Sequence, residues 1–141
     1  MTTIAYHHAS KKIAIDSRVS SGGIIDTDAY NKTISNGSGI WFLAGALSDC
    51  KEFSELEHGA TSSRTLSCSA LLIRDGCVYE VTTNDNKCCT MLEITFNATL
   101  GSGRNFALAA MDYGASAADA VKYAATRDMY SGGKVRVFNV K

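Results

Sequence analysis

The 141-residue chain contains no proline and carries no net charge, because 14 Lys and Arg residues balance 14 Asp and Glu residues. Without proline, the turns must rest on glycine, asparagine, aspartate and serine, as in the segments SSGG (20–23) and SNGSG (35–39). The balanced charge provides no basic field for nucleic acid and no polybasic segment for an anionic membrane. We therefore expect protein or peptide partners, and neither a nucleic acid nor a membrane.

Long apolar runs are also missing. No stretch approaches the roughly 18 residues that a bilayer-spanning helix needs, and the first residues lack the charged-then-apolar layout of a secretion signal. These features predict a cytoplasmic protein, of bacterial or viral origin. The length fits one domain over residues 1–141.

Ligand sets for metals and nucleotides are equally scarce. The five cysteines are odd in number, include the adjacent pair Cys88-Cys89 and form no C-x-x-C motif, so we expect reduced, mostly buried thiols. His7, His8 and His58 have no cysteine or carboxylate neighbours at ligand spacing, which predicts no metal. No glycine-rich loop ends in Gly-Lys-Ser or Gly-Lys-Thr, so we expect no nucleotide and no other cofactor.

What the sequence does contain is a series of strand signals. Alternating apolar residues, or apolar runs bounded by turn residues, predict strands over 2–8, 12–17, 33–35, 40–43, 66–73, 77–81, 91–100 and 135–138. Trp41 and Leu43 alternate with Phe42, so both faces of that strand are expected to be covered. Asp75-Gly76 between two apolar runs predicts a tight hairpin.

Helix signals occur in three places. A short helix is predicted over 48–58 with Ser48 as its N-cap, a second around 106–111 that ends at Gly114, and a third capped by Ser116. The order of strands, one helix, strands, two helices and a strand predicts an α+β fold layered around a sandwich of sheets.

The turn Gly101-Ser102-Gly103 ends an apolar strand and opens a helix. Ser102 therefore lies at a helix N-terminus, where backbone N–H groups point outward. Two interpretations remain open from the local sequence. Ser102 is either a simple N-cap, or a residue that orients a polar neighbour or holds an anion.

Six segments, taken in order, resemble the proteasome-type N-terminal nucleophile (Ntn) hydrolases, which comprise β-type proteasome subunits and the bacterial ATP-dependent HslV-like peptidase. The segments are TTIAY (2–6), IDSR (15–18), NKT (31–33), AGALSDC (44–50), GSG (101–103) and RDMYSGG (127–133). The resemblance covers nearly the whole chain. It implies an Ntn-hydrolase-like αββα sandwich of two antiparallel sheets.

The resemblance also implies a catalytic centre. Removal of Met1 would expose Thr2, whose hydroxyl would attack the peptide carbonyl while its free amine accepts the proton. The charge of Lys32 would lower the effective pKa of the Thr2 hydroxyl, and Asp16 would keep Lys32 charged. The backbone N–H of Gly45 would stabilise the tetrahedral oxyanion.

A second group of residues would surround the terminal amine. By resemblance, Ser102, Asp128 and Ser131 would form a hydrogen-bonded set there. Each candidate also has an ordinary structural interpretation: Lys32 as a solvated cation, Asp16 as a turn cap and Asp128 as a helix terminator. The order in which the residues occur is what favours the catalytic interpretation.

Two departures from the family pattern matter. Only a short helix and a polar linker separate the Gly45 segment from the next hairpin, so one outer helix layer is expected to be truncated. The register at the start is ambiguous, because a gapless alignment places Met1 rather than Thr2 at the nucleophile position, and the enzyme would then be inactive.

The leading hypothesis is a threonine-type peptidase that acts on peptides or unfolded proteins within a self-assembled homo-oligomer. The resemblance also implies an ATP-driven unfoldase as its partner. The alternative is a catalytically inactive proteasome-like structural or regulatory protein that retains Met1. An amidase acting on a small amide is a third candidate. Ser20, Ala46 and Leu47 fall where the family builds its primary pocket, which favours an apolar residue before the scissile bond.

Overall fold

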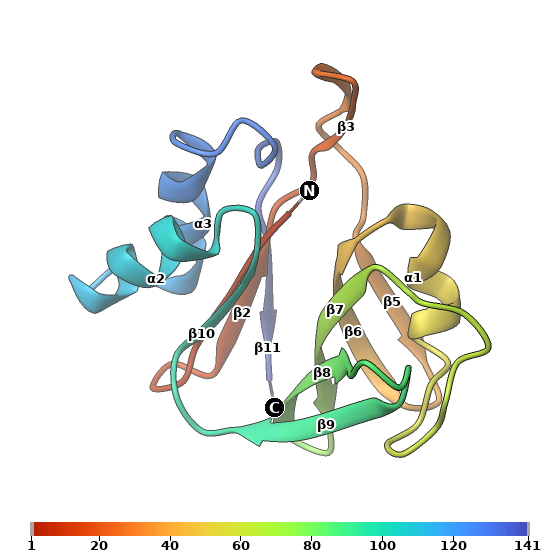
Figure 1. The fold of residues 1–141 in the computed structure, drawn as a ribbon. Helices are drawn as coiled ribbons and strands as arrows, with labels where there is room; N and C mark the ends of the chain where they lie inside the picture. Colours follow the sequence, from red (N-terminus) through yellow and green to blue (C-terminus); the bar gives the residue numbers. More distant parts are fainter. Residues whose placement is uncertain (1, 141) are drawn as a thin grey trace.

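Two antiparallel sheets pack face to face in the computed structural model, which describes residues 2–140 (Figure 1). The first sheet has the order β10-β1-β2-β11, with bounds Ala98–Gly101, Thr3–His7, Lys12–Ile15 and Arg136–Asn139. The second has the order β5-β6-β7-β8-β9, with bounds Thr33–Asn36, Gly39–Gly45, Cys68–Arg74, Cys77–Thr83 and Cys89–Ile94. The predicted α+β class with a sandwich of sheets is confirmed.

Strand alternation explains how the sheets share the core. In β1, Ile4 and Tyr6 face the second sheet and join Phe42 and Leu71 in a buried cluster between the sheets. Ala5 lies on the opposite face of β1 and packs against the helices α2 (Arg104–Asp112) and α3 (Ala117–Ala125). Its small side chain allows these helices to approach the sheet closely, which completes one outer layer.

The second sheet is also covered on both faces, as the sequence of β6 predicted. Trp41 and Leu43 point away from the first sheet and pack with Phe53 of helix α1 (Leu47–Phe53). The rings of Trp41 and Phe53 meet edge to face, with centroids 6.2 Å apart. The layers therefore run helix, sheet, sheet, helix.

The helix predicted over 48–58 is wrong at both ends. Helix α1 begins after Ala46, which gives no side-chain cap, so Ser48 lies inside the helix and is not its N-cap. Strand β6 ends at Gly45, which has a positive φ of +131°. The Asp49 N–H then donates a 3.0 Å hydrogen bond to the Ala46 carbonyl, which closes the first turn of α1. The helix ends at Phe53, where the Ser54 hydroxyl caps the Lys51 carbonyl at 2.7 Å.

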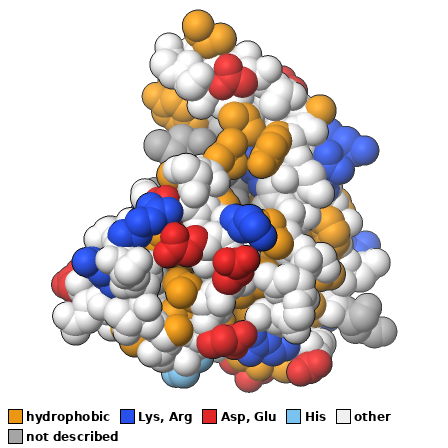
Figure 2. All heavy atoms as spheres, turned by 90° about the vertical axis from the view of Figure 1, so that its right-hand side faces the viewer, with side chains coloured by type: hydrophobic (Ala, Val, Ile, Leu, Met, Phe, Trp, Pro, Cys, Tyr) orange, Lys and Arg blue, Asp and Glu red, His pale blue; other side chains and the backbone are white. Residues whose placement is uncertain are grey.

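The outer layer beside the second sheet consists of α1 alone among residues 2–140, so the expected truncation is confirmed. Residues 54–67 replace further helix with a loop tied down by Asp49, which accepts hydrogen bonds from Arg64 at 2.7 Å and Ser67 N–H at 2.9 Å. Figure 2 views this side and shows acidic and basic side chains lying side by side. The ion pairs of α1 and of this loop include Lys51–Glu55 at 3.3 Å and Arg64–Glu52 at 3.2 Å.

A hairpin of β3 (Val19–Ser21) and β4 (Ile24–Thr27) was missed at the sequence level, where only its turn was recognised. The hairpin projects from the top of the molecule (Figures 1 and 2), and Ile24 is 67% exposed at its tip. Because neither face of this ribbon is buried in a core, its residues carry no apolar alternation from which strands could be predicted.

The strand predicted over 91–100 is divided in the structure. The chain leaves β9 after Ile94, crosses from one sheet to the other and enters β10 at Ala98. Asn97 fixes this crossing by accepting a 2.8 Å hydrogen bond from the His8 N–H. The other helix signals were correct: Ser116 caps α3 through Asp119 N–H at 3.1 Å, and Gly114 follows the end of α2.

All five cysteines are free thiols, but only Cys50 and Cys89 are buried, so the expectation of mostly buried thiols is wrong for the other three. Within residues 2–140, no three His, Cys, Asp or Glu side chains are grouped as a metal ion would need. None of the helices described there combines the length and the apolar character that crossing a bilayer requires.

Candidate active site

Thr2 lies just before β1 and is only 3% exposed. Its carbonyl accepts hydrogen bonds from Gly103 N–H at 3.4 Å and from the Ser102 hydroxyl at 3.3 Å. Gly101 passes directly beside it with φ +96°, and a Cβ at this glycine would lie 2.0 Å from the Thr2 carbonyl oxygen. Only glycine fits both the backbone conformation and the space, so the Gly101-Ser102-Gly103 turn holds Thr2 in place.

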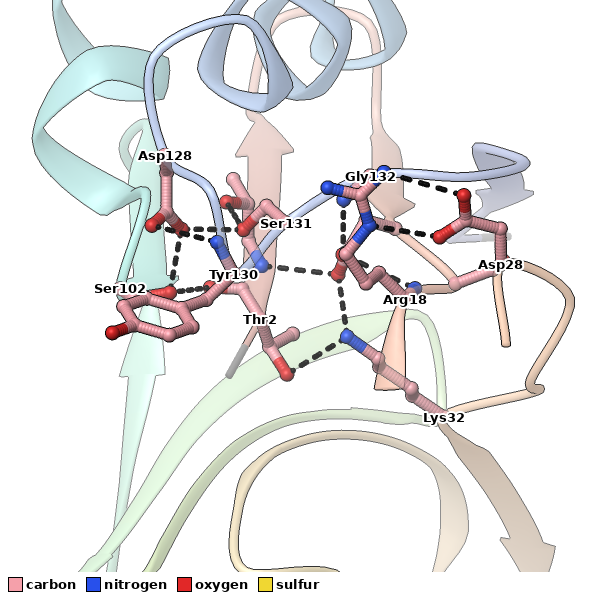
Figure 3. Close-up of polar contacts among 12 residues, drawn as sticks. Thr2, Arg18, Asp28, Lys32, Ser102, Asp128, Tyr130, Ser131 and Gly132 are labelled. Carbon is pink, nitrogen blue, oxygen red and sulfur yellow. Dashed lines mark hydrogen bonds and ion pairs between the residues drawn. The ribbon is translucent and has the colours of Figure 1, made fainter. Parts of the chain in front are cut away.

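Lys32 and Asp16 form an ion pair beside the Thr2 hydroxyl (Figure 3). Lys32 Nζ lies 2.8 Å from Asp16 Oδ1 and donates a 3.2 Å hydrogen bond to Thr2 Oγ1. The Lys32 side chain is 4% exposed and that of Asp16 is completely buried. The alternative in which Lys32 is a solvated surface cation is therefore wrong.

Asp16 also organises the surrounding backbone. Its Oδ1 accepts Thr3 N–H at 3.1 Å, and its Oδ2 accepts Gly132 N–H at 2.9 Å and Arg18 N–H at 3.4 Å. These bonds join the start of β1, the end of β2 and the Ser-Gly-Gly segment near the C-terminus. Asp16 is thus not merely a turn cap, because its carboxylate is the shared acceptor of three separate segments.

Arg18 supports this arrangement from outside. Its guanidinium pairs with Asp28 at 2.8 Å and donates to the Met129 carbonyl at 3.2 Å. A Cβ at Gly132 would lie 2.5 Å from Arg18 Cζ, so the guanidinium packs directly on this glycine. Figure 3 shows Arg18, Asp28 and Gly132 grouped on the side of the site away from Asp128.

Ser102, Asp128 and Ser131 form one hydrogen-bonded group on the other side of Thr2 (Figure 3). Both serine hydroxyls donate to Asp128 Oδ2, at 2.6 Å from Ser102 and 2.7 Å from Ser131. The Ser131 hydroxyl also contacts Thr3 Oγ1 at 2.6 Å. The interpretation of Ser102 as an N-cap is wrong, because Gly103 occupies the N-cap position of α2 and the Ser102 hydroxyl bonds Asp128 and Thr2 instead.

Gly45 lines a pocket of about 640 Å³, and Thr2 and Lys32 line the same pocket. It ends β6 with φ +131°, and a Cβ there would lie 2.0 Å from the Ser67 carbonyl oxygen. The hairpin β3–β4 forms another wall of the pocket. Ser20, Ala46 and Leu47, the residues selected as pocket candidates from the sequence, all line it.

Burial changes the acid–base character of Lys32. Loss of hydration lowers the pKa of the Lys32 ammonium below its ordinary value, while the adjacent Asp16 carboxylate opposes this effect. Lys32 therefore gives up its proton at a lower pH than an exposed lysine does, at a position in contact with the Thr2 hydroxyl.

The structure brings all seven sequence-selected residues to the surroundings of Thr2: Asp16, Lys32, Gly45, Ser102, Asp128 and Ser131, with Thr2 itself. Sequence reasoning missed the supporting roles of Thr3, Arg18 and Gly132. Gly132 had a usable signal, since a glycine pair such as Gly132-Gly133 often marks a close backbone approach. The Thr3–Ser131 contact joins residues 128 positions apart, and no local pattern reports it.

No protein-family model matches the sequence, and a search of curated proteins finds no match. Solved structures do match. Eukaryotic HslV from Trypanosoma brucei aligns with a TM-score of 0.75 at 19% identity, covering 97% of this chain and 98% of that chain. BPH from Thiobacillus denitrificans in complex with epoxomicin gives 0.72 at 19% identity and 97% coverage of both chains.

A second structure of BPH from the same organism gives a TM-score of 0.70 at 21% identity and covers 98% of this chain and 96% of that chain. At these identities the likeness concerns the fold. The chain has the fold of the proteasome-type Ntn hydrolases, and the resemblance drawn from its sequence is confirmed at that level.

Proposed function

We propose that this chain is a threonine-type peptidase whose nucleophile is Thr2, exposed by removal of Met1. One observation carries the proposal. Lys32 Nζ lies 3.2 Å from Thr2 Oγ1 and 2.8 Å from Asp16 Oδ1, and all three side chains are buried. Thr2 and Lys32 also line a pocket large enough for a side chain. A hydroxyl, a desolvated lysine and an orienting carboxylate within hydrogen-bonding reach are the parts of an activated nucleophile.

The chemistry begins at the Thr2 hydroxyl. As its oxygen attacks the peptide carbonyl carbon, the hydroxyl proton passes to the freed α-amine of Thr2, and the charge of Lys32 stabilises the developing alkoxide. The tetrahedral oxyanion accepts a hydrogen bond from Gly45 N–H. The amine then gives its proton to the leaving nitrogen, the C–N bond breaks, and water cleaves the resulting ester by the reverse route.

The Ser102–Asp128–Ser131 group positions the amine. Ser102 bonds the carbonyl of Thr2, and Ser131 bonds the side chain of Thr3, so the group holds the chain on both sides of the Thr2–Thr3 peptide. Asp128 fixes both serines through one carboxylate oxygen. This arrangement limits the rotation of Thr2 and keeps the amine near its own hydroxyl.

The proposed substrates are peptides or unfolded protein segments, cleaved within a homo-oligomer. The resemblance to HslV-like peptidases supports this, and so does the fold shared with HslV of T. brucei. An ATP-driven unfoldase partner belongs to the same proposal. Within residues 2–140, α1 alone forms the outer layer beside the second sheet, so contacts between oligomers would use a different surface from that of a longer helix pair.

Hydrolysis of an unstructured fluorogenic peptide tests the proposal. We expect turnover by protein that begins at Thr2, produced by cleaving a removable leader, and none by matched protein that retains Met1. In the form that retains Met1, the Thr2 nitrogen is part of a peptide bond and cannot act as an amine, but the Thr2–Lys32–Asp16 contacts remain. Equal turnover by both forms, or none by either, would contradict the proposal; none by either would favour the non-catalytic scaffold.

The pH profile tests the role of Lys32. Turnover should rise with pH as the Thr2 amine, with an ordinary α-amino pKa of about 8, loses its proton. It should fall again as Lys32 is deprotonated. Because burial lowers the pKa of Lys32, this fall should come at a lower pH than for an exposed lysine. Lys32→Arg keeps the positive charge and should move the loss of turnover to higher pH. If turnover in this variant falls at the same alkaline pH as in wild type, Lys32 is not the group whose deprotonation stops the reaction.

A further inference from the structure

Two thiols lie together at the edge of the Thr2 pocket, Cys50 in its wall and Cys68 directly behind Cys50, and neither takes part in the chemistry proposed above. Cys50 lies in α1 and Cys68 begins β7, and their Sγ atoms are 3.8 Å apart. Both thiols also face one backbone oxygen, the Ala46 carbonyl, at 3.3 Å from Cys50 and 3.7 Å from Cys68. Cys50 lines the same pocket as Thr2 and Lys32.

The two sulfurs differ in their readiness to ionise. The hydrogen bond from the Cys68 thiol stabilises a Cys50 thiolate and lowers the pKa of Cys50. Burial and the Asp49 carboxylate oppose this effect, and the charge of Lys32 adds to it. The same contact, together with burial, raises the pKa of Cys68. A more acidic thiol beside a less acidic one is the arrangement of an attacking and a resolving cysteine.

We propose that Cys50 and Cys68 form a dithiol site beside the Thr2 pocket, that a peroxide oxidises this pair to a disulfide, and that the disulfide slows the reaction of Thr2. The first two statements stand on the thiol geometry, and the third rests on the proposed peptidase function. Cys50, the thiol that would be oxidised first, lines the Thr2 pocket, so a small oxidant such as hydrogen peroxide can reach it there.

The reaction balances with peroxide as the only oxidant. The Cys50 thiolate attacks one peroxide oxygen, the O–O bond breaks, and the departing hydroxide takes up the thiol proton to give water and a Cys50 sulfenic acid. The sulfur of Cys68 then attacks the sulfur of Cys50, the S–O bond breaks, and the departing hydroxide takes the proton of Cys68 as a second water. The two thiols lose two electrons and two protons, which reduce the peroxide.

The disulfide would change the geometry at Gly45. A disulfide bond is about 2.05 Å long, so the two sulfurs must approach each other by roughly 1.8 Å from their separation of 3.8 Å. Cys68 is the sheet partner of Gly45, and the thiol of Cys50 rests on the carbonyl of Ala46. The displacement therefore acts on the segment that supplies the oxyanion N–H, where an error of about 1 Å lowers the rate by roughly a hundredfold.

Peptide mapping after hydrogen peroxide treatment tests the site without any activity assay. Free thiols are blocked by alkylation, and the digest is analysed with and without a reductant. We expect a peptide pair joined through Cys50 and Cys68 that the reductant separates. Recovery of both residues as alkylated thiols, or joined to other cysteines, would overturn the proposal. Cys77→Ser is the matched control and should leave the linked pair unchanged, whereas Cys68→Ser should abolish it.

The effect on Thr2 is measured on the same samples. Labelling by an epoxyketone should slow by roughly tenfold or more in oxidised wild type, recover with reductant, and stay unaffected by peroxide in the Cys50→Ser and Cys68→Ser variants. Unchanged labelling of fully oxidised protein would refute the control of Thr2. If the disulfide forms but even the reduced protein takes no label, the peptidase proposal and the control of Thr2 fail together, while the dithiol site stands.

Discussion

Replacing Thr2 by alanine is expected to reduce peptide hydrolysis by roughly 10⁴-fold or more, because the nucleophilic oxygen is lost. The cost in stability should be small, on the order of 1 kcal/mol, since among residues 2–140 the Thr2 hydroxyl makes one side-chain hydrogen bond, to Lys32, and Lys32 keeps its ion pair with Asp16. Steady-state turnover and urea unfolding of the Met1-free variant measure the two effects separately.

Thr2→Ser is the matched control for this experiment. It retains the hydroxyl and the amine and loses only a methyl group, so measurable turnover should remain. Substantial hydrolysis by Thr2→Ala would show that another residue attacks the substrate. A variant that loses both activity and folding would point to a structural role for Thr2 in place of a catalytic one.

Replacing Asp16 by alanine is expected to produce the largest loss of stability in the site, about 3–5 kcal/mol. Its carboxylate is the acceptor for the Lys32 ammonium and for the N–H groups of Thr3 and Gly132. Without it, the buried Lys32 charge loses its ion pair and two buried N–H groups lose this acceptor, and the free energy of unfolding falls accordingly. Urea unfolding followed by fluorescence of Trp41 measures this loss.

Two further variants identify the cause. Lys32→Met in the Asp16→Ala background removes the buried ammonium whose ion pair has been lost and should restore part of the stability. Asp28→Ala removes a carboxylate of the exposed Arg18 pair and should cost far less than Asp16→Ala, because solvent screens that pair. If Asp16→Ala unfolds at the same urea concentration as wild type, Asp16 does not hold these segments together.

The parts of the fold that were predicted correctly are those fixed by local chemistry. Ser116 caps α3 and Gly114 ends the preceding helix, because each function depends on neighbouring backbone groups alone. The hairpin β3–β4 was missed because neither of its faces is buried in a core. The bounds of α1 were wrong because the helix starts after Gly45 and is held in place by contacts of Asp49 with the distant Arg64 and Ser67.

The candidate site shows the same division. Asp16 and Lys32 could be selected by resemblance, but their burial and their contact with Thr2 depend on the packing of three separate strands or strand ends. The choice between an N-cap and a polar partner for Ser102 was open locally, and Asp128, 26 positions away, decides it. Contacts of this length follow from the fold and cannot be read from sequence spacing.

The central claim is that Thr2 becomes an N-terminal nucleophile, and intact mass spectrometry of protein from the native host tests it most directly, with and without an epoxyketone inhibitor. A chain that lacks Met1 and gains one inhibitor mass on Thr2, with no gain in a Lys32→Ala variant, is the predicted result. A chain that keeps Met1 and takes up no inhibitor would contradict the claim, and would leave a proteasome-shaped scaffold without the threonine chemistry.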